Sequence, residues 1–234
     1  MAGQAYAAEI KVIGSPGFRE AYNVLVPQFE KATGNRVTTI WDGVNDVAMR
    51  VAAGETADIV ILPAAQIEEL TQKGKLATGS RVDVAKSGIG VAIKPGAPKP
   101  DLRSGETLKA ALLKAKSIAY STGPSGVHIA RLLQQWGIAD VLKSRIVIAP
   151  SDTPVGEMLA RGQAEIGFQQ VSELIRIKGI DYLGPLPNDV QEVTVFAAAL
   201  HKNAAASDAA KALVKFLSAP AAAETIRKAG MEPG

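Results

Sequence analysis

Residues 10–62 alternate between short β-rich runs and helical patterns, joined by loops of small residues. The apolar or β-rich runs at 10–13, 36–41 and 58–62 predict three strands. Apolar residues spaced three and four apart predict a helix over 18–34 and another beginning at 47–51. Strands that alternate with helices in this way indicate a parallel sheet covered by helices, which is an α/β fold.

The first two predicted strands each end in a loop that opens onto a helix, at residues 14–17 and 42–45. In an open parallel sheet, such loops gather at the carboxyl edge of the strands, where ligands bind. A helix N-terminus offers unpaired backbone N–H groups and the positive end of a dipole, which suits an anion. The opening segment therefore predicts a binding site for a negatively charged ligand.

The alternation continues along the chain. Further strands are predicted over 84–93, 117–120, 145–149, 164–168 and 191–200, and further helices over 64–73, 107–114, 127–136, 207–217 and 220–229. This is too many units for one compact sheet of ordinary size. We therefore expect two lobes, with residues 8–84 and 192–234 in the first and 85–191 in the second. The chain would cross between them within 81–87 and 188–195, and polar loops would face a cleft between the lobes.

Composition excludes several classes of protein. The chain has 234 residues and no cysteine, which rules out disulfides and thiolate chemistry. Its net charge of +3 is dispersed rather than clustered, so we expect no nucleic-acid partner. No apolar run approaches the length of a membrane span. Residues 5–7 read Ala-Tyr-Ala, a pattern found before a signal-peptidase cut. We therefore expect a periplasmic protein whose signal peptide has been removed, with 1–7 as a remnant or a disordered start; a frayed terminus of a cytosolic protein is the alternative.

The motifs of common enzymes are missing from the sequence. There is no G-x-S-x-G nucleophile elbow, no P-loop and no H-E-x-x-H zinc motif. His128 and His201 have no metal-ligating partner at a useful spacing, and we interpret both as surface or capping residues. From these observations we expect no cofactor, no metal and no enzymatic activity.

Three segments carry a resemblance to a known family. They read F-E-K-A-T-G-N-R-V at 29–37, G-E-T-A-D-I-V-I at 54–61 and R-G-Q-A-E-I-G at 161–167. With these segments the chain resembles the periplasmic solute-binding proteins of ABC transporters, of the type that includes the molybdate-binding proteins. The resemblance implies a two-lobed type II fold, each lobe a mixed, mostly parallel sheet flanked by helices. It also implies a monomer that closes on a small ligand and delivers it to an ABC transporter permease.

The positions that match the family's ligand-binding residues differ here. Where molybdate binders present serines in the first two loops, this chain has Gly17 and Val44, and Gln170 matches a tyrosine. The ligand therefore stays open between a molybdate- or tungstate-type oxyanion and a small organic carboxylate. Two alternatives remain for the function, a ligand-sensing domain related to transcription regulators and a catalytic derivative of the same scaffold.

The predicted ligand-binding residues lie in the polar loops and at the helix starts that follow them. They are Ser15, Gly17, Phe18, Val44, Asn45, Ser121, Thr122, Ser125, Gly126, Thr153, Val155 and Gln170, with Arg81, Lys86 and Gln169 as weaker candidates. Hydroxyls, amides and backbone N–H groups can hold oxygen atoms without a full counter-charge. We expect Asp42 to cap the following helix instead, because a free carboxylate would repel an anion, and Trp41 to lie in the core or the cleft wall.

Overall fold

The computed structural model describes residues 8–204 and 207–234, so the predicted signal remnant at 1–7 lies outside the described residues. The chain divides into two compact units. Unit 1 comprises Met1–Lys86 and Val195–Gly234, and unit 2 comprises Ser87–Thr194. The boundaries expected from the sequence, after residues 84 and 191, lie two and three residues before those of the structure, after residues 86 and 194.

Unit 1 is built on a sheet with parallel strands at its centre. β1 (Glu9–Gly14) pairs in parallel with β2 (Arg36–Trp41) on one side and with β3 (Ile59–Pro63) on the other. β9 (Val193–Leu200) runs antiparallel to β3, and the short β10 (Glu232–Pro233) runs antiparallel to the first half of β4 (Val82–Ile93), opposite Ala85 and Lys86. The carboxyl ends of β1, β2 and β3 therefore meet at one edge of the sheet.

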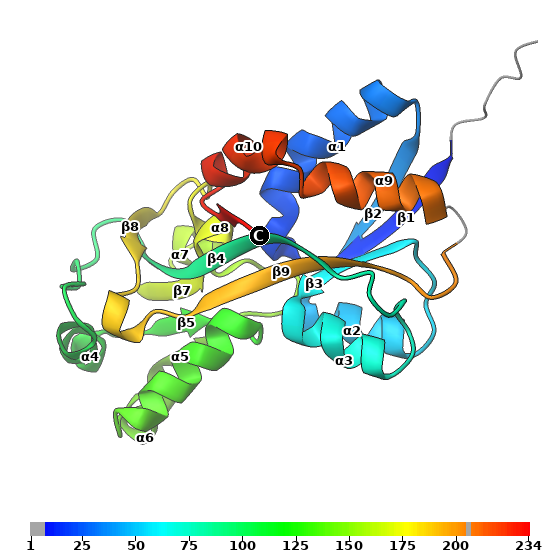
Figure 1. The fold of residues 1–234 in the computed structure, drawn as a ribbon. Coiled ribbons are helices and arrows are strands. Elements are labelled where there is room, and N and C mark those ends of the chain that lie inside the picture. The colour runs from blue at the N-terminus through cyan, green and yellow to red at the C-terminus, as the bar shows by residue number, and fades with distance from the viewer. Residues whose placement is uncertain (1–7, 205–206) are drawn as a thin grey trace, which may run out of the picture. The chain divides into compact units, whose positions relative to one another are not determined.

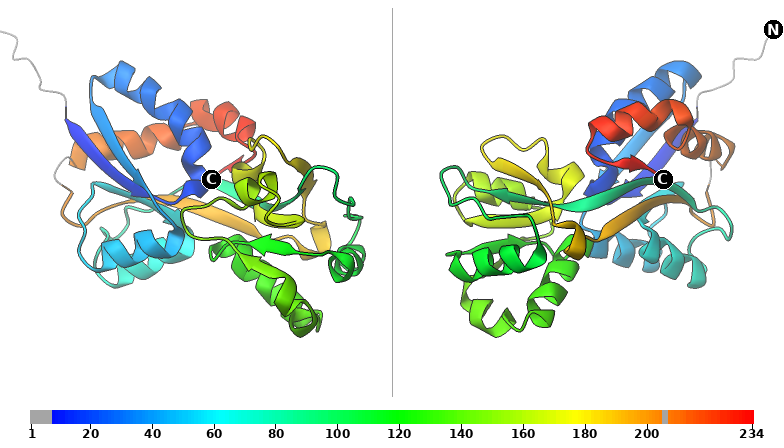
Figure 2. Two further views of the ribbon diagram at one scale, coloured as in Figure 1. Left: turned by 180° about the vertical axis from the view of Figure 1, so that it is seen from behind. Right: turned by 60° about the vertical axis from the view of Figure 1, so that its left-hand side comes forward.

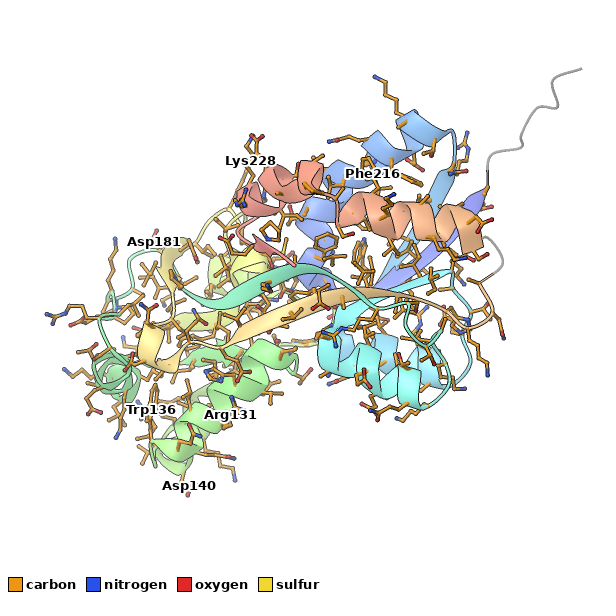
Figure 3. All side chains as sticks on the ribbon, in the orientation of Figure 1. Arg131, Trp136, Asp140, Asp181, Phe216 and Lys228 are labelled. Carbon is orange, nitrogen blue, oxygen red and sulfur yellow. The ribbon has the colours of Figure 1, made fainter. Side chains whose placement is uncertain are left out.

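Helices cover both faces of this sheet. In Figure 1, α1 (Arg19–Thr33), α9 (Ser207–Leu217) and α10 (Ala223–Lys228) lie on one face, and α2 (Val44–Ala52) and α3 (Ala64–Gln72) lie on the other. Each face has its own apolar core. On the first, the ring of Phe216, labelled in Figure 3, packs edge-on against Phe29 with ring centroids 5.6 Å apart. α1 ends where Gly34 adopts a φ of 73°, a left-handed conformation that glycine takes without strain.

Unit 2 contains β5 (Ile118–Tyr120) flanked in parallel by β6 (Ile146–Ile148) and β7 (Ile166–Gln170). β4 (Val82–Ile93) runs antiparallel to β7 and to β8 (Asp181–Pro185). Figure 2 shows α5 (Pro124–Gln135) and α6 (Ala139–Leu142) on one face and α7 (Val155–Ala160) and α8 (Val171–Leu174) on the other. α4 (Gly105–Lys114) packs into the same core as α5.

Short 3-10 turns complete the described structure, at Pro16–Phe18, Lys143–Arg145, Asn188–Val190 and Pro220–Ala222. The predicted α/β class, with mostly parallel strands and flanking helices, is confirmed. Among the helices of the described residues, none combines the length and the apolar character that crossing a membrane requires.

Candidate functional site

Ser15 follows β1 directly and is completely buried. Its backbone N–H donates to the carbonyl of Ile61 at 3.0 Å, which fixes the residue beside the end of β3. Its hydroxyl has no hydrogen-bond partner, although it is shielded from solvent. A buried polar group left unpaired costs about 1–3 kcal/mol, so native proteins rarely keep one without a use. The hydroxyl of Ser15 is therefore a strong candidate for contact with a ligand.

Gly17 and Phe18, in the 3-10 turn that follows Ser15, are fixed by packing. A β-carbon built on Gly17 would lie 2.1 Å from Cζ of Phe196, closer than any real contact. The serine that the resemblance places at this position would therefore not fit without moving the ring. Phe18 is completely buried and its ring belongs to the core, so its side chain is not available to a ligand.

The loop after β2 is held by an ion-pair network. Arg50 donates from Nε and Nη2 to the carboxylate of Glu55, at 2.6 and 2.9 Å, and from Nη1 to Asp42 at 3.0 Å. These hydrogen bonds from Arg50 hold the pKa of Glu55 below its usual range. The negative charge of Asp42 is thus balanced at the loop where we expect an anion.

The expectation that Asp42 caps α2 is wrong. The N-cap residue is Gly43, with no side-chain cap, and Asp42 accepts the N–H of Gly43 instead, at 2.8 Å. Val44 and Asn45 form the first turn of α2, Val44 half-buried and Asn45 exposed. Trp41 packs edge-on against Tyr22, with ring centroids 5.0 Å apart, so it lies against the unit 1 core.

The third strand of unit 1 carries a residue that sequence reasoning missed. β3 leads into α3 with no intervening loop, and Gln66 lies in the first turn of that helix. Its Oε1 atom is buried and has no hydrogen-bond partner. The signal in the sequence was that Gln66 follows the third predicted strand at the start of the next predicted helix. Glutamine is usually a surface residue, however, so this position did not stand out.

In unit 2, the loop after β5 is closed by a tight backbone contact. A β-carbon on Gly126 would lie 1.6 Å from the carbonyl oxygen of Ser121, so this position accepts only glycine. The hydroxyl of Ser121 accepts the N–H of Gly123 at 3.3 Å. Ser125 is buried in the first turn of α5, and Thr122 is exposed.

The candidates near α7 are joined by hydrogen bonds within unit 2. The N–H of Val155 donates to Oε1 of Gln169 at 2.9 Å, and Nε2 of Gln169 donates to Glu173 at 2.8 Å. Val155 therefore has no free N–H to offer a ligand, contrary to the prediction. The hydroxyl of Thr153 lies 3.0 Å from the carboxylate of Asp152, to which it donates.

Gln170 is also used within unit 2. Its Oε1 accepts from the hydroxyl of Thr194 at 2.9 Å, and its Nε2 lies 3.1 Å from the carbonyl of Ser87 and 3.2 Å from that of Gly88. Ser87 and Thr194 are the first and last residues of the unit. The Gln170 amide thus links the two chain segments that enter and leave unit 2.

Neither basic candidate lies at the carboxyl end of a strand, because Arg81 directly precedes β4 and Lys86 lies within it. Arg81 is exposed and forms an ion pair with Asp83 at 2.9 Å, and this hydrogen bond raises the pKa of Arg81. Lys86 is exposed and lies opposite Glu232 in the β4–β10 pairing.

The histidines were expected to be surface or capping residues, and neither lies at the surface, since each is only 6% exposed. Nε2 of His128 donates to the carbonyl of Val190 at 2.8 Å, and its Nδ1 lies 2.8 Å from Arg131, labelled in Figure 3. His201 accepts the N–H of Asn203 at Nδ1, and burial lowers its pKa. Within residues 8–204 and 207–234, no group of His, Asp or Glu side chains could hold a metal ion.

Comparison with known proteins identifies the family. The family model described as "Bacterial extracellular solute-binding protein" matches residues 10–232. An aconitate isomerase from Pseudomonas sp is 35% identical over 96% of this chain and 87% of its own length. The molybdate-binding protein ModA from Azotobacter vinelandii is 28% identical over 98% of this chain and 92% of its own length.

Solved structures agree with this assignment. The A. vinelandii periplasmic molybdate-binding protein superposes with a TM-score of 0.80 at 24% identity, covering 96% of this chain and 99% of its own. The sulfate-binding protein SubI from Mycobacterium tuberculosis gives 0.78 at 16% identity, covering 97% and 87%. The fold expected from the sequence is therefore confirmed.

The expectation of no enzymatic activity is wrong as a conclusion from missing motifs, because the 35%-identical relative is named as an enzyme. The other relatives named above are binding proteins, and the family is extracytoplasmic. The chain belongs to the bacterial extracellular solute-binding proteins and is of the ModA-like periplasmic type.

Proposed function

We propose that this protein binds a small organic polycarboxylate, aconitate, and interconverts its cis and trans isomers. The observation that carries the proposal is the contrast between Ser15 and Gly17 at the end of β1. Ser15 offers a buried hydroxyl without a partner, whereas the ring of Phe196 excludes a side chain at Gly17, where molybdate binders place a serine. Val44 likewise carries no hydroxyl in the second loop. A hydroxyl set altered in this way favours a ligand other than a tetrahedral oxyanion, and the aconitate isomerase relative supports an organic acid.

The chemistry of aconitate makes such a reaction accessible to a binding protein. Aconitate is propene-1,2,3-tricarboxylate, in which a methylene group lies next to the double bond. A base removes one methylene proton, the electron pair delocalises over the three carbons, and a proton returns to the carbon that was formerly vinylic. The double bond has then moved by one position, and its new geometry can be cis or trans. Neutral donors that hold the carboxylates would stabilise the negative charge that develops.

Proton NMR of the purified protein with cis-aconitate tests the proposal. We expect the signals of trans-aconitate to grow in proportion to protein concentration until both isomers reach equilibrium. Running the reaction in D₂O would place deuterium on the carbon chain if the proton exchanges with solvent. A rate no faster than that of heat-denatured protein would overturn the proposed isomerase activity.

The ModA relatives support a second proposal, that the chain delivers a bound solute to an ABC importer from the periplasm. Uptake of labelled aconitate by cells that lack this gene, with and without complementation, measures delivery. N-terminal sequencing of the protein released by osmotic shock measures export and signal-peptide removal. Uptake that is unchanged by the gene would count against the transport role.

A further inference from the structure

Two buried side-chain atoms in the described part of the chain have no hydrogen-bond partner, and both belong to unit 1. They are Oγ of Ser15 and Oε1 of Gln66. Each is shielded from water, so each carries the cost of an unpaired polar group. The other buried side-chain nitrogen and oxygen atoms of the described residues have partners, which makes the place of these two informative.

The two residues lie at the carboxyl ends of neighbouring parallel strands. β1 pairs with β3 through Gly14 and Ile61, and the N–H of Ser15 donates to the carbonyl of the same Ile61. β3 ends at Pro63, and Gln66 follows in the first turn of α3. In a parallel sheet, this edge is where ligands bind. Both unpaired atoms therefore belong to residues at the edge of the sheet where ligands bind in this kind of fold.

From this we infer that Gln66 is a ligand-binding residue and that, with Ser15, it holds one carboxylate of the organic acid. The inference rests on the proposed function and names part of its site. A hydroxyl and an amide are both neutral donors. Turning the amide by 180° places Nε2 where Oε1 now lies, so both side chains can donate to carboxylate oxygens. In this proposal the side chains of Ser15 and Gln66 gain their hydrogen-bond partners from the ligand.

The affinity for trans-aconitate, measured by calorimetric titration, tests the inference. Gln66→Met keeps the length of the side chain and removes the amide, and we expect its Kd to rise about tenfold to a hundredfold. Gln66→Glu adds a negative charge to the subsite and is expected to weaken binding further. Gln72→Met, on the exposed last turn of the same helix, is the matched control and should bind as the wild type does.

Two further readouts separate a ligand contact from a structural role. Because Oε1 of Gln66 accepts no hydrogen bond from the rest of the chain, Gln66→Met should not lower the melting temperature. If Ser15 and Gln66 hold the same carboxylate, the double variant Ser15→Ala/Gln66→Met should lose less affinity than the two single losses combined. Wild-type protein that binds no organic acid would defeat the proposed function itself. Tight wild-type binding that Gln66→Met leaves unchanged would overturn this inference alone.

Discussion

The α-carbon of Gly17 faces the ring of Phe196, and a β-carbon there would lie 2.1, 2.4 and 2.9 Å from three of its atoms. Phe196 is only 2% exposed and belongs to the unit 1 core, so the ring has little room to withdraw. The two residues are far apart in sequence, yet the Phe196 ring excludes any side chain at position 17 of the first loop.

Gly17→Ser should therefore destabilise the protein by about 1–3 kcal/mol, the usual cost of forcing extra atoms into a packed core. Urea denaturation of the wild type and the variant measures the loss. In the background of Phe196→Leu the same substitution should cost less, because the smaller side chain leaves space. Equal costs in both backgrounds would show that the ring does not limit this position.

Gln169 should be a structural residue of unit 2. Gln169→Leu removes the acceptor for the buried N–H of Val155, and we expect a loss of about 1–3 kcal/mol in unfolding free energy. Gln163→Leu, at an exposed position, is the control and should stay near the wild-type value. A Gln169→Leu variant as stable as the control would contradict the importance of this hydrogen bond.

His201 should make stability depend on pH. Burial lowers its pKa below the ordinary value of 6.5, with a further lowering from Lys75 and an opposing effect from Asp58. Its contribution is complete above pH 6.5 and is lost as pH falls through the folded-state pKa, because the unfolded chain binds the proton more readily. Between pH 8 and pH 5, the free energy of unfolding, measured by urea denaturation at each pH, should fall more steeply for the wild type than for His201→Asn. An equal pH dependence of the unfolding free energy in the two proteins would contradict a role for His201.

The Arg50 network should support both stability and anion binding. Arg50→Gln removes the partner of Asp42 beside the second loop and leaves its charge unbalanced. We expect weaker binding of a carboxylate ligand, most clearly at low salt, where charges are least screened. Arg36→Gln makes the same change in net charge at an exposed position and serves as the control. If both variants bind equally well, the network has no role in the site.

The same network should also make the free energy of unfolding depend on pH in the acidic range, through Glu55. Arg50 holds the pKa of Glu55 below its ordinary 4.5. The resulting stabilisation is present above pH 4.5 and is lost as pH falls through the lowered pKa. The difference in unfolding free energy between wild type and Arg50→Gln should therefore shrink on acidification below pH 4.5. A difference that stays constant down to full protonation would count against this coupling.

Local patterns in the sequence predicted the first three strands well, although they gave no strand at the positions of β8 and β10. β2 spans Arg36–Trp41, the range read from its β-rich run, and β1 and β3 differ by one residue at each end. The start of α2 was placed three residues late, because Gly43 caps the helix without a side chain and gives no signal in the sequence. Strand and helix periodicity depend on neighbouring residues, which is why they can be read from the chain.

The site was harder to predict, because its properties depend on residues far apart. The placement of Ser15 after a strand and of Ser125 at a helix start follows from strand–loop–helix patterns, but the contact of Gly17 with Phe196 does not. The sequence also did not separate Gln169 and Gln170, whose hydrogen bonds lie inside unit 2, from Gln66, whose Oε1 atom has no partner. The three amides are chemically identical, and only the folded structure distinguishes them.

Calorimetric titration of the purified protein with trans-aconitate, cis-aconitate and molybdate tests the central claim most directly. The account predicts that the two aconitates bind and that molybdate does not, and that Ser15→Ala weakens the binding of both aconitates. Tight binding of molybdate with no heat from either aconitate would contradict it, and would mean that backbone donors replace the hydroxyls missing at Gly17 and Val44.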